Sequence, residues 1–324
     1  MQAVIITEQG GPEVLQVQER PEPQPGPGQV RVAVAACGVN FIDIYQRSGV
    51  YPMSTPFICG SEGAGEVTAV GSGVSDVAVG DHVAWAMVPA GGYATEVVIP
   101  AEQTVPVPPT VDDETAAALM LQGLTAHYLC ESTYPVQAGD DVLLHAGAGG
   151  VGLLLTQLIS AKGGRVLATT STPAKAELAR GAGAAEVIAY TESDVAAEVR
   201  RLTDGRGVAV VYDGVGQATF AASLDSLRPR GMLVLFGASS GAVDPVDPQT
   251  LNQKGSLFLT RPSLPHYIAS REELLWRAAA LFEAVASGRL DVRVGARYSL
   301  AEAGRAHEDL AGRRTTGKSL IIPS

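Results

Sequence analysis

Roughly the first 120 residues alternate short apolar runs with turn residues, a pattern typical of β-structure. This pattern predicts strands at Val4–Thr7, Val30–Ala35, Gly65–Val70, His82–Ala86 and Ala94–Ile99. Turn signals such as Gly71-Ser72-Gly73 separate the runs. The proline-rich stretch at 20–28 is too short to separate domains, so we expect a fixed, extended surface loop there.

From about Asp141 onward the apolar spacing changes to an alternation of strands and helices. The predicted strands are Val142–His145, Arg165–Thr169, Glu186–Ala189, Val208–Tyr212, Met232–Phe236 and Leu257–Thr260. The predicted helices are Gly150–Ala161, one capped by Thr172 with Pro173 in first position, Val195–Leu202, and one after Gly216. This order predicts an α/β domain with a doubly wound parallel sheet. The tail from about Pro262, with helix Arg271–Ala286 and strand Ser319–Ile322, is too small to stand alone and should return to the first domain.

Composition narrows the classes of protein that fit. The 324 residues exceed the size of one typical core, and 46% of them are hydrophobic, enough for two cores. A net charge of −11 argues against nucleic-acid binding. The chain shows neither a secretory signal nor an apolar run long enough to cross a membrane. Three widely spaced cysteines argue against a disulfide framework, so we expect a cytoplasmic protein.

The strongest motif is a glycine-rich turn between a predicted strand and a predicted helix. It reads Gly147-Ala148-Gly149-Gly150-Val151-Gly152. The first glycine allows a tight turn, the second lets the backbone approach a pyrophosphate, and the third permits close packing of helix on strand. Amides at the helix N-terminus would then face the phosphates. The motif in this context predicts a dinucleotide site.

The end of the second strand of this domain indicates which dinucleotide binds. NAD-specific sites place Asp or Glu there to bind the ribose 2′-hydroxyl. Here the segment reads Ala168-Thr169-Thr170-Ser171-Thr172, without a carboxylate, and Lys175 follows within one helical turn. Hydroxyls and a lysine can bind a 2′-phosphate, whereas a carboxylate would repel it. NADPH is therefore the predicted cofactor.

Metal and covalent chemistry lack their usual motifs. The five histidines show no ligand spacing, and HxxxH, CxxC and GxSxG do not occur. His145 closes the first strand of the second domain, where we expect a packed, hydrogen-bonded histidine.

The sequence resembles the zinc-independent quinone oxidoreductase (zeta-crystallin-like) branch of the medium-chain dehydrogenase/reductase superfamily. The resemblance runs nearly end to end. It is carried by residues 10–15 (GGPEVL), 38–43 (GVNFID), 47–51 (RSGVY), 60–63 (GSEG), 145–152 (HAGAGGVG), 211–216 (VYDGVG), 236–237 (FG), 251–256 (LNQKGS) and 260–264 (TRPSL). The implied fold is a Rossmann domain at 124–262 and a GroES-like β-rich catalytic domain at 1–123 and 263–324.

The resemblance also implies that no zinc is bound. Metal-dependent relatives carry a cysteine and a His-Glu pair where this chain has Asn40 and Ser61-Glu62. A third ligand, a cysteine in the segment corresponding to 121–126, is missing, as is the structural-zinc lobe. Alcohol oxidation is therefore not expected.

The site residues implied by the resemblance form two sets. Asn40 and Tyr45 should lie beside the nicotinamide, with Thr125 nearby. Apart from the resemblance, their hydroxyl groups make Tyr45 and Tyr51 candidate donors to a developing oxyanion. The other implied cofactor contacts are the turn residues Gly147, Gly149, Gly150, Val151 and Gly152, the 2′-phosphate set Thr170, Ser171, Lys175 and Tyr190, and the lining residues Gly216, Phe236, Gly237, Ser239, Ser240 and Arg313. One departure is Gln122, where close relatives often carry lysine.

Three functions remain open at this point. The first is an NADPH:quinone oxidoreductase. The second is an NADPH-dependent reductase of α,β-unsaturated aldehydes or ketones, because neighbouring branches share the cofactor site. The third is a non-catalytic NADPH-binding protein with a structural or RNA-binding role, against which the acidic charge weighs. Family resemblance further implies a homodimer joined through the edge strand at Leu257–Thr260.

Overall fold

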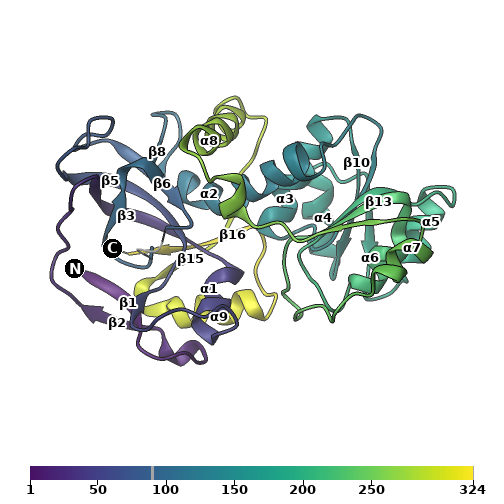
Figure 1. Cartoon of the computed structure of the whole chain (residues 1–324), viewed down its shortest axis with the longest axis horizontal. Helices are drawn as coiled ribbons and strands as arrows, with labels where there is room; N and C mark the ends of the chain where they lie inside the picture. The colour runs from purple at the N-terminus through teal and green to yellow at the C-terminus, as the bar shows by residue number, and fades with distance from the viewer. Residues whose placement is uncertain (89–90, 324) are drawn as a thin grey trace. The chain divides into compact units, whose positions relative to one another are not determined.

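The computed structural model describes residues 1–88 and 91–323, and the chain divides into two units. Unit 1 comprises Met1–Leu124 together with Ile268–Ser324, and unit 2 comprises Thr125–Tyr267. The last strand, β16 (Lys318–Ile322), pairs with β3 (Gln29–Val39), so the C-terminal segment belongs to the same sheet as the N-terminal strands. Figure 1 shows this yellow strand among the blue ones.

Unit 2 is built on a six-stranded sheet in the described part of the chain, and every strand pair in it is parallel. Its strands, in spatial order, are β11 (Glu186–Ala189), β10 (Arg165–Thr170), β9 (Asp141–Leu144), β12 (Val208–Asp213), β13 (Leu227–Leu235) and β14 (Phe258–Thr260). The order reverses at β9, which lies between β10 and β12, and ligands of such sheets bind at the carboxyl ends of the strands beside this reversal. The predicted doubly wound parallel sheet is confirmed.

Helices alternate with these strands and cover both faces of the sheet. They are α3 (Gly150–Ala161), α4 (Pro173–Gly181), α5 (Val195–Leu202), α6 (Phe220–Ser226) and α7 (Pro248–Gln253). Contacts pair α3 with α4 and α5 with α6, as expected when the chain winds in one direction and then the other (Figure 1). Strand residues such as Leu143, Leu167 and Val211 are fully buried in the core between them.

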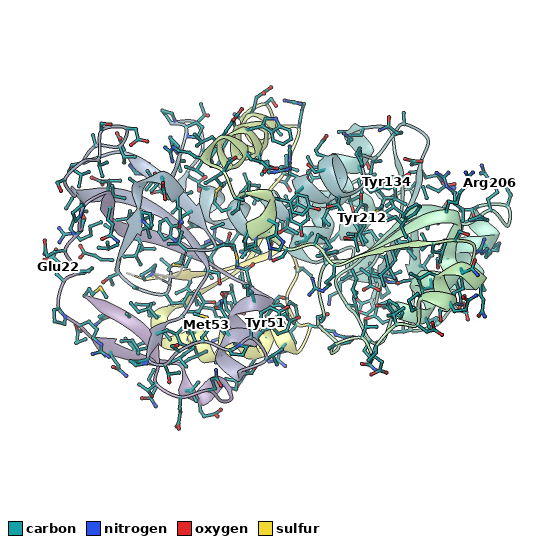
Figure 2. All side chains as sticks on the ribbon, viewed as in Figure 1. Glu22, Tyr51, Met53, Tyr134, Arg206 and Tyr212 are labelled. Atoms are coloured by element: carbon teal, nitrogen blue, oxygen red, sulfur yellow. The ribbon has the colours of Figure 1, made fainter. Side chains whose placement is uncertain are left out.

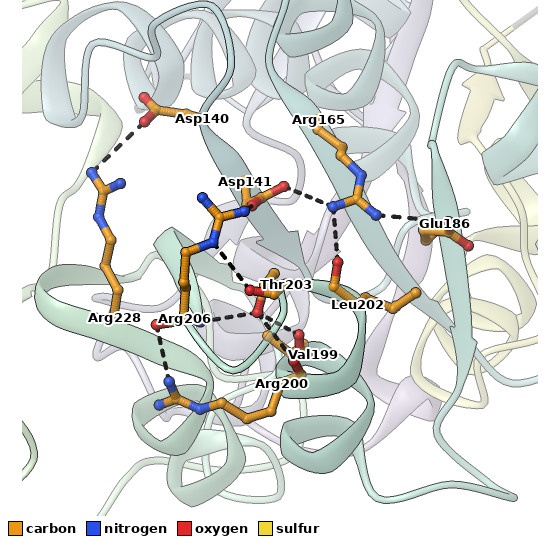
Figure 3. Close-up of polar contacts among 11 residues, drawn as sticks. Asp140, Asp141, Arg165, Glu186, Val199, Arg200, Leu202, Thr203, Arg206 and Arg228 are labelled. Carbon is orange, nitrogen blue, oxygen red and sulfur yellow. Dashed lines mark hydrogen bonds and ion pairs between the residues drawn. The ribbon is translucent and has the colours of Figure 1, made fainter.

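Ion pairs tie together the amino-terminal edge of this sheet (Figure 3). At the start of β10, Nη1 of Arg165 donates to Oδ1 of Asp141 at 3.0 Å and to the carbonyl of Leu202 at 3.1 Å. Its other terminal nitrogen lies 3.7 Å from Glu186, and Arg206 lies 3.8 Å from Asp141. Each such surface pair stabilises the fold by at most about 1 kcal/mol. The charges at this edge are thus paired with one another, on the side opposite the carboxyl ends.

Unit 1 is mainly β-structure. Its larger sheet contains β15 (Val294–Ser299), β16, β3, β5 (Glu62–Val70), β6 (His82–Ala86) and β8 (Val105–Pro106), with β7 (Glu96–Pro100) also paired to β3. A smaller sheet contains β2 (Gln16–Glu19), β1 (Gln2–Ile6) and β4 (Phe57–Ile58). The helices of unit 1 are α1 (Phe41–Ser48), α8 (Arg271–Ala286) and α9 (Ala303–Ala311), and the boundary between the units falls within α2 (Asp113–Tyr128).

The predicted elements differ from the observed ones mainly in unit 1. The predicted strand Val30–Ala35 extends to Val39, and helix α1 was not predicted at all. In unit 2, His145 lies just after β9 and Phe236 just after β13, rather than within those strands. Helices α3 and α5 and strand β11 have the predicted bounds, because glycine, proline and capping residues mark their ends. Across the described ranges, none of the helices combines the length and apolar character needed to cross a bilayer.

Candidate active site

The glycine-rich turn joins β9 to α3 at the carboxyl edge of the unit 2 sheet. The amide of Gly147 donates to the carbonyl of Thr169 at 3.0 Å, which holds the turn against β10. A Cβ at Gly147 would lie 2.7 Å from the Cβ of Ala168, and one at Gly152 would collide with the carbonyl of Ala146. Helix α3 begins directly after Gly149, so its first amides, at Gly150 and Val151, are available at the turn. The turn therefore fits a pyrophosphate at the helix N-terminus.

A series of hydrogen-bonded, buried side chains lies next to this turn. Nδ1 of His145 lies 3.2 Å from Oγ1 of Thr169, and its Nε2 lies 3.0 Å from Oγ of Ser223. Ser223 donates to Asp213 at 2.7 Å, and Asp213 also accepts from the amide of Gly216 at 3.0 Å. Burial lowers the pKa of His145, so the imidazole is neutral and can donate from one nitrogen while accepting at the other. The predicted packed histidine is confirmed, and it joins the ends of β9, β10 and β12.

The predicted 2′-phosphate corner lies at the neighbouring strand ends. Thr170 ends β10 and is paired with Ala189, the last residue of β11. The amide of Tyr190 donates to the carbonyl of Thr170 at 3.2 Å, so Ser171 and Tyr190 follow directly from adjacent strands. Thr172 caps α4 by accepting from the amide of Lys175, which places Lys175 in the first turn of that helix. The positions of these hydroxyl residues and of Lys175 therefore follow the ends of two adjacent strands.

Two further segments of unit 2 lie at the carboxyl ends of β12 and β13. The amides of Phe236 and Gly237 donate to the carbonyl of Asp213 at 2.8 and 3.3 Å. Ser240 donates to the carbonyl of Val215 at 2.8 Å, and the amide of Ser239 donates to Gly214 at 3.2 Å. The predicted lining residues therefore lie on two hydrogen-bonded loops, 213–216 and 236–241. Thr125 is buried on α2, at the start of unit 2.

The predicted catalytic residues lie together on α1 of unit 1 and its flanks. Asn40 precedes the first residue of the helix, and Tyr45 lies within it. Tyr51, labelled in Figure 2, follows the helix. The two tyrosine rings meet edge to face with centroids 5.2 Å apart, and the amide of Tyr51 donates to the carbonyl of Tyr45 at 3.0 Å. Arg313 belongs to the same unit, in a left-handed conformation (φ 57°) just after α9.

A buried ion pair holds the side chain of Asn40. Oδ1 of Asn40 accepts from Nζ of Lys318 at 2.8 Å, and its Nδ2 donates to Oε1 of Glu62 at 2.7 Å. Lys318 and Glu62 contact each other directly, and both are almost entirely inaccessible to solvent. The other carboxylate oxygen of Glu62 accepts from the amide of Leu121. Nε2 of Gln122 lies 3.5 Å from Oδ1 of Asn40, at the limit of a hydrogen bond.

A second buried chain holds the backbone of Asn40. Oδ2 of Asp43 accepts from the amide of Asn40 at 2.8 Å and from the hydroxyl of Tyr93 at 3.2 Å. The Tyr93 hydroxyl also lies 3.1 Å from Nε2 of His307, whose Nδ1 lies 3.3 Å from Nη1 of Arg47. Because arginine only donates, Nδ1 of His307 accepts and Nε2 donates. Burial, with the nearby Arg47, lowers the pKa of His307 to about 3, in keeping with a neutral ring.

The described residues offer no cluster of metal ligands. In residues 1–88 and 91–323, no group of three or more His, Cys, Asp and Glu side chains is placed to hold a metal ion. Asn40 is bordered by the ammonium group of Lys318, a cation rather than a ligand.

Known proteins resemble this chain over nearly its whole length. Residues 26–109 match the alcohol dehydrogenase GroES-like domain, and residues 150–273 match the zinc-binding dehydrogenase family. The chain is 48% identical to a quinone oxidoreductase of Pseudomonas aeruginosa over 97% of both chains. The chain belongs to the quinone oxidoreductase branch of the medium-chain dehydrogenase/reductase superfamily. The predicted family and the predicted pairing of a GroES-like domain with a Rossmann domain are both confirmed.

Two further relatives bear on the chemistry of this quinone oxidoreductase family member. A structure of Escherichia coli quinone oxidoreductase complexed with NADPH superimposes with a TM-score of 0.98 at 44% identity, covering 100% of both chains. A 2-haloacrylate reductase of a Burkholderia species is 42% identical, covering 99% of this chain and 98% of its own.

Sequence reasoning missed the polar groups that surround Asn40. Glu62 entered only as a departure from the zinc pattern, and Lys318 and Asp43 did not enter as site residues. Lys318 and Glu62 are 256 positions apart, so spacing along the chain could not join them. The one available signal was a lysine at the start of the last strand, whose final three residues are apolar, because a buried charge requires a partner.

Proposed function

We propose that the protein reduces quinones with NADPH by hydride transfer. The observation that carries this proposal is the phosphate turn of unit 2 beside a strand end without a carboxylate, in a chain of the quinone oxidoreductase family. The amides at the start of α3 would bind the pyrophosphate, and Ser171, Lys175 and Tyr190 would bind the 2′-phosphate. When bound, NADPH supplies the hydride.

The residues of unit 1 would serve the acceptor. Asn40 would lie beside the nicotinamide, with its backbone and side chain each held by buried carboxylates. Tyr45 and Tyr51 would offer hydroxyl groups to the oxygen that gains negative charge. In this division of labour, residues 1–123 and 263–324 form the catalytic domain and residues 124–262 the cofactor domain. Orientation and exclusion of water would supply much of the rate.

We propose that this reaction needs no zinc. The groups that meet at Asn40 support this: an amide, an ammonium group and a carboxylate that already accepts from both of them. Zinc prefers thiolate, imidazole and carboxylate ligands that are free to bind it. Activity should therefore survive treatment with a chelator.

A second substrate class has its own support. Because a 2-haloacrylate reductase is 42% identical over nearly the full length, an activated carbon–carbon double bond is the alternative acceptor. Either acceptor would receive hydride at an electrophilic position, and neither requires a different cofactor site.

We further propose a homodimer joined through β14. This strand lies at the edge of the unit 2 sheet, and the side chain of Phe258 on it is 56% exposed. An exposed apolar edge strand favours pairing with a second copy. Light scattering coupled to size-exclusion chromatography measures the mass directly, and a monomer at micromolar concentration would contradict this proposal.

The test of function follows NADPH absorbance with chelator-treated protein. 1,4-Benzoquinone, an ortho-quinone and 2-chloroacrylate are offered separately, and each assay is repeated with NADH. Quinone-dependent oxidation that prefers NADPH is the expected result. Turnover of 2-chloroacrylate alone would favour the second substrate class, and tight NADPH binding without turnover of any acceptor would contradict an enzymatic role.

A further inference from the structure

The carboxamide of Asn40 has a hydrogen-bond partner at each end, and both partners belong to one ion pair. Lys318 donates to its oxygen at 2.8 Å, and Glu62 accepts from its nitrogen at 2.7 Å. An ammonium group only donates and a carboxylate only accepts. A reversed amide would place N–H groups against the ammonium and an oxygen against the carboxylate. The ion pair therefore determines which end of the Asn40 amide points in which direction.

The ion pair is itself held in one place. Glu62 and Lys318 are 0% and 1% exposed, so neither side chain can exchange its partner for water. The second oxygen of Glu62 is fixed by the amide of Leu121 at the interior of α2. A side chain at Gly38 would collide with both Glu62 and Lys318, so the glycine leaves the space that the pair fills. The strands that carry these residues, β3, β5 and β16, belong to one sheet.

We propose that Lys318 and Glu62 are positioning residues for the reduction and act through Asn40. This inference rests on the proposed function, in which Asn40 lies in the catalytic site. The two charges of the pair oppose each other at direct contact, so its contribution is the orientation of the amide rather than a net charge at the substrate. Loss of the pair should lower kcat, while the affinity for NADPH, whose phosphate contacts lie in unit 2, should change little.

The decisive variant is Glu62→Gln combined with Lys318→Met. A single substitution would leave one charge buried without a partner, which is strongly destabilising, whereas the double substitution removes both charges and nearly keeps the volume. We expect the double variant to melt within about 5 °C of the wild type. We also expect kcat with a quinone to fall by about a hundredfold, the scale for a misplaced catalytic group, while the Kd for NADPH stays within about threefold. Wild-type kcat in this variant would overturn the proposal.

A comparison with Asn40→Ala tests whether the pair acts through Asn40. If it does, adding E62Q and K318M to N40A should lower kcat no further than N40A alone, because the group that they orient is already absent. Losses that multiply would show that the pair acts by another route and would overturn the proposal. If the pair only stabilises the fold, the result should differ. The double variant should then have a higher melting temperature than either single variant, and its kcat should return toward the wild-type value as well.

A second ion pair of the same unit, between a buried arginine and a partly exposed glutamate, provides a control. Arg277 on α8 is 1% exposed and forms an ion pair with Glu273, far along the chain from the site residues. The variant E273Q/R277M should keep the wild-type kcat. If E62Q/K318M does not fold, E62Q/K318Q also removes both charges and keeps a polar group at each position. Because each glutamine amide can donate or accept, this pair no longer sets the direction of the Asn40 amide, and an unchanged kcat in that variant would also overturn the proposal. Absence of quinone reduction by the wild-type protein would instead refute the proposed function.

Discussion

Replacing Asp43 with asparagine should make the stability of unit 1 less dependent on pH. Asp43 is fully buried and accepts hydrogen bonds from the Asn40 amide, the Ser61 hydroxyl and the Tyr93 hydroxyl. Burial raises the pKa of Asp43 from 3.8 to about 6, and the bonds from Ser61 and Asn40 only partly oppose this. A carboxylate thus occupies this position even though burial disfavours its charged form.

The magnitude follows from linkage between proton binding and folding. The folded state binds the proton of Asp43 more tightly than the unfolded state, so the free energy of unfolding falls as pH rises from below 3.8 to above 6. At about 1.4 kcal/mol per pKa unit, the total loss is about 3 kcal/mol, and roughly half of it occurs between pH 5 and pH 8. An asparagine has no such loss. Its oxygen can accept from Asn40 and Tyr93, and its nitrogen can donate to the Ser61 oxygen once that hydroxyl rotates.

The assay is urea unfolding of wild type and D43N at pH 5, 6, 7 and 8, followed by tryptophan fluorescence. Both tryptophans, Trp85 and Trp276, belong to unit 1, so the signal reports the unit that contains Asp43. The advantage of D43N over wild type should grow by about 1 to 2 kcal/mol across this range. Parallel pH dependences of the two proteins would refute the reasoning.

Asp309 provides a control of opposite sign. Hydrogen bonds from Arg314 and Tyr298 lower the pKa of Asp309, so its contribution is complete above its unfolded-state pKa and is lost only as pH falls below that value. The stability difference between wild type and D309N should therefore stay constant from pH 5 to pH 8. A difference that changed in step with that of D43N would point to a general effect of net charge.

Three further predictions concern the cofactor and the acceptor. Lys175→Ala should raise the KM for NADPH about tenfold and leave that for NADH unchanged, since the loss of a hydrogen bond from a charged group is worth roughly 1.5–3 kcal/mol; equal effects on both cofactors would contradict a 2′-phosphate contact. Gly152→Ala should weaken NADPH binding by roughly ten- to hundredfold, because the new Cβ collides with the Ala146 carbonyl and overpacking costs about 1–3 kcal/mol. Calorimetry measures the Kd, and an unchanged Kd would contradict this prediction. At least one of Tyr45→Phe and Tyr51→Phe should lower kcat for a quinone by about a hundredfold, the effect of removing one oxyanion donor; near wild-type kcat in both would exclude a tyrosine donor.

The cofactor side of the molecule could be predicted from sequence because its signals are local. Between Asp141 and Ala161, one strand, one turn and one helix carry the whole phosphate motif in consecutive residues. Thr170 and Lys175, which we propose to contact the 2′-phosphate, lie within the next strand and helix. In such a segment the hydrophobic period, the glycines and the caps all act within a few residues, so each can be recognised without knowledge of the tertiary fold.

Unit 1 was less predictable because its determining contacts are remote in sequence. Helix α1 has only eight residues, and Asp43 within it accepts hydrogen bonds from Ser61 and Tyr93, which lie outside the helix. A buried aspartate or lysine is costly in isolation, and nothing in the neighbouring residues shows that a partner will be present. Only the fold of the sheet brings Lys318 to Glu62.

The segments 38–43 and 60–63 can now be understood as two halves of one polar assembly. Gly38 leaves room for the Glu62–Lys318 pair. The Asn40 amide accepts a hydrogen bond from Lys318 and donates one to Glu62. Asp43 in turn accepts from the backbone of Asn40 and from Ser61. Each segment therefore supplies groups that the other must satisfy, and a change in either one would leave a buried polar atom unpaired, at a cost of roughly 1–3 kcal/mol. This mutual dependence gives a physical reason for both short motifs to occur together in one chain.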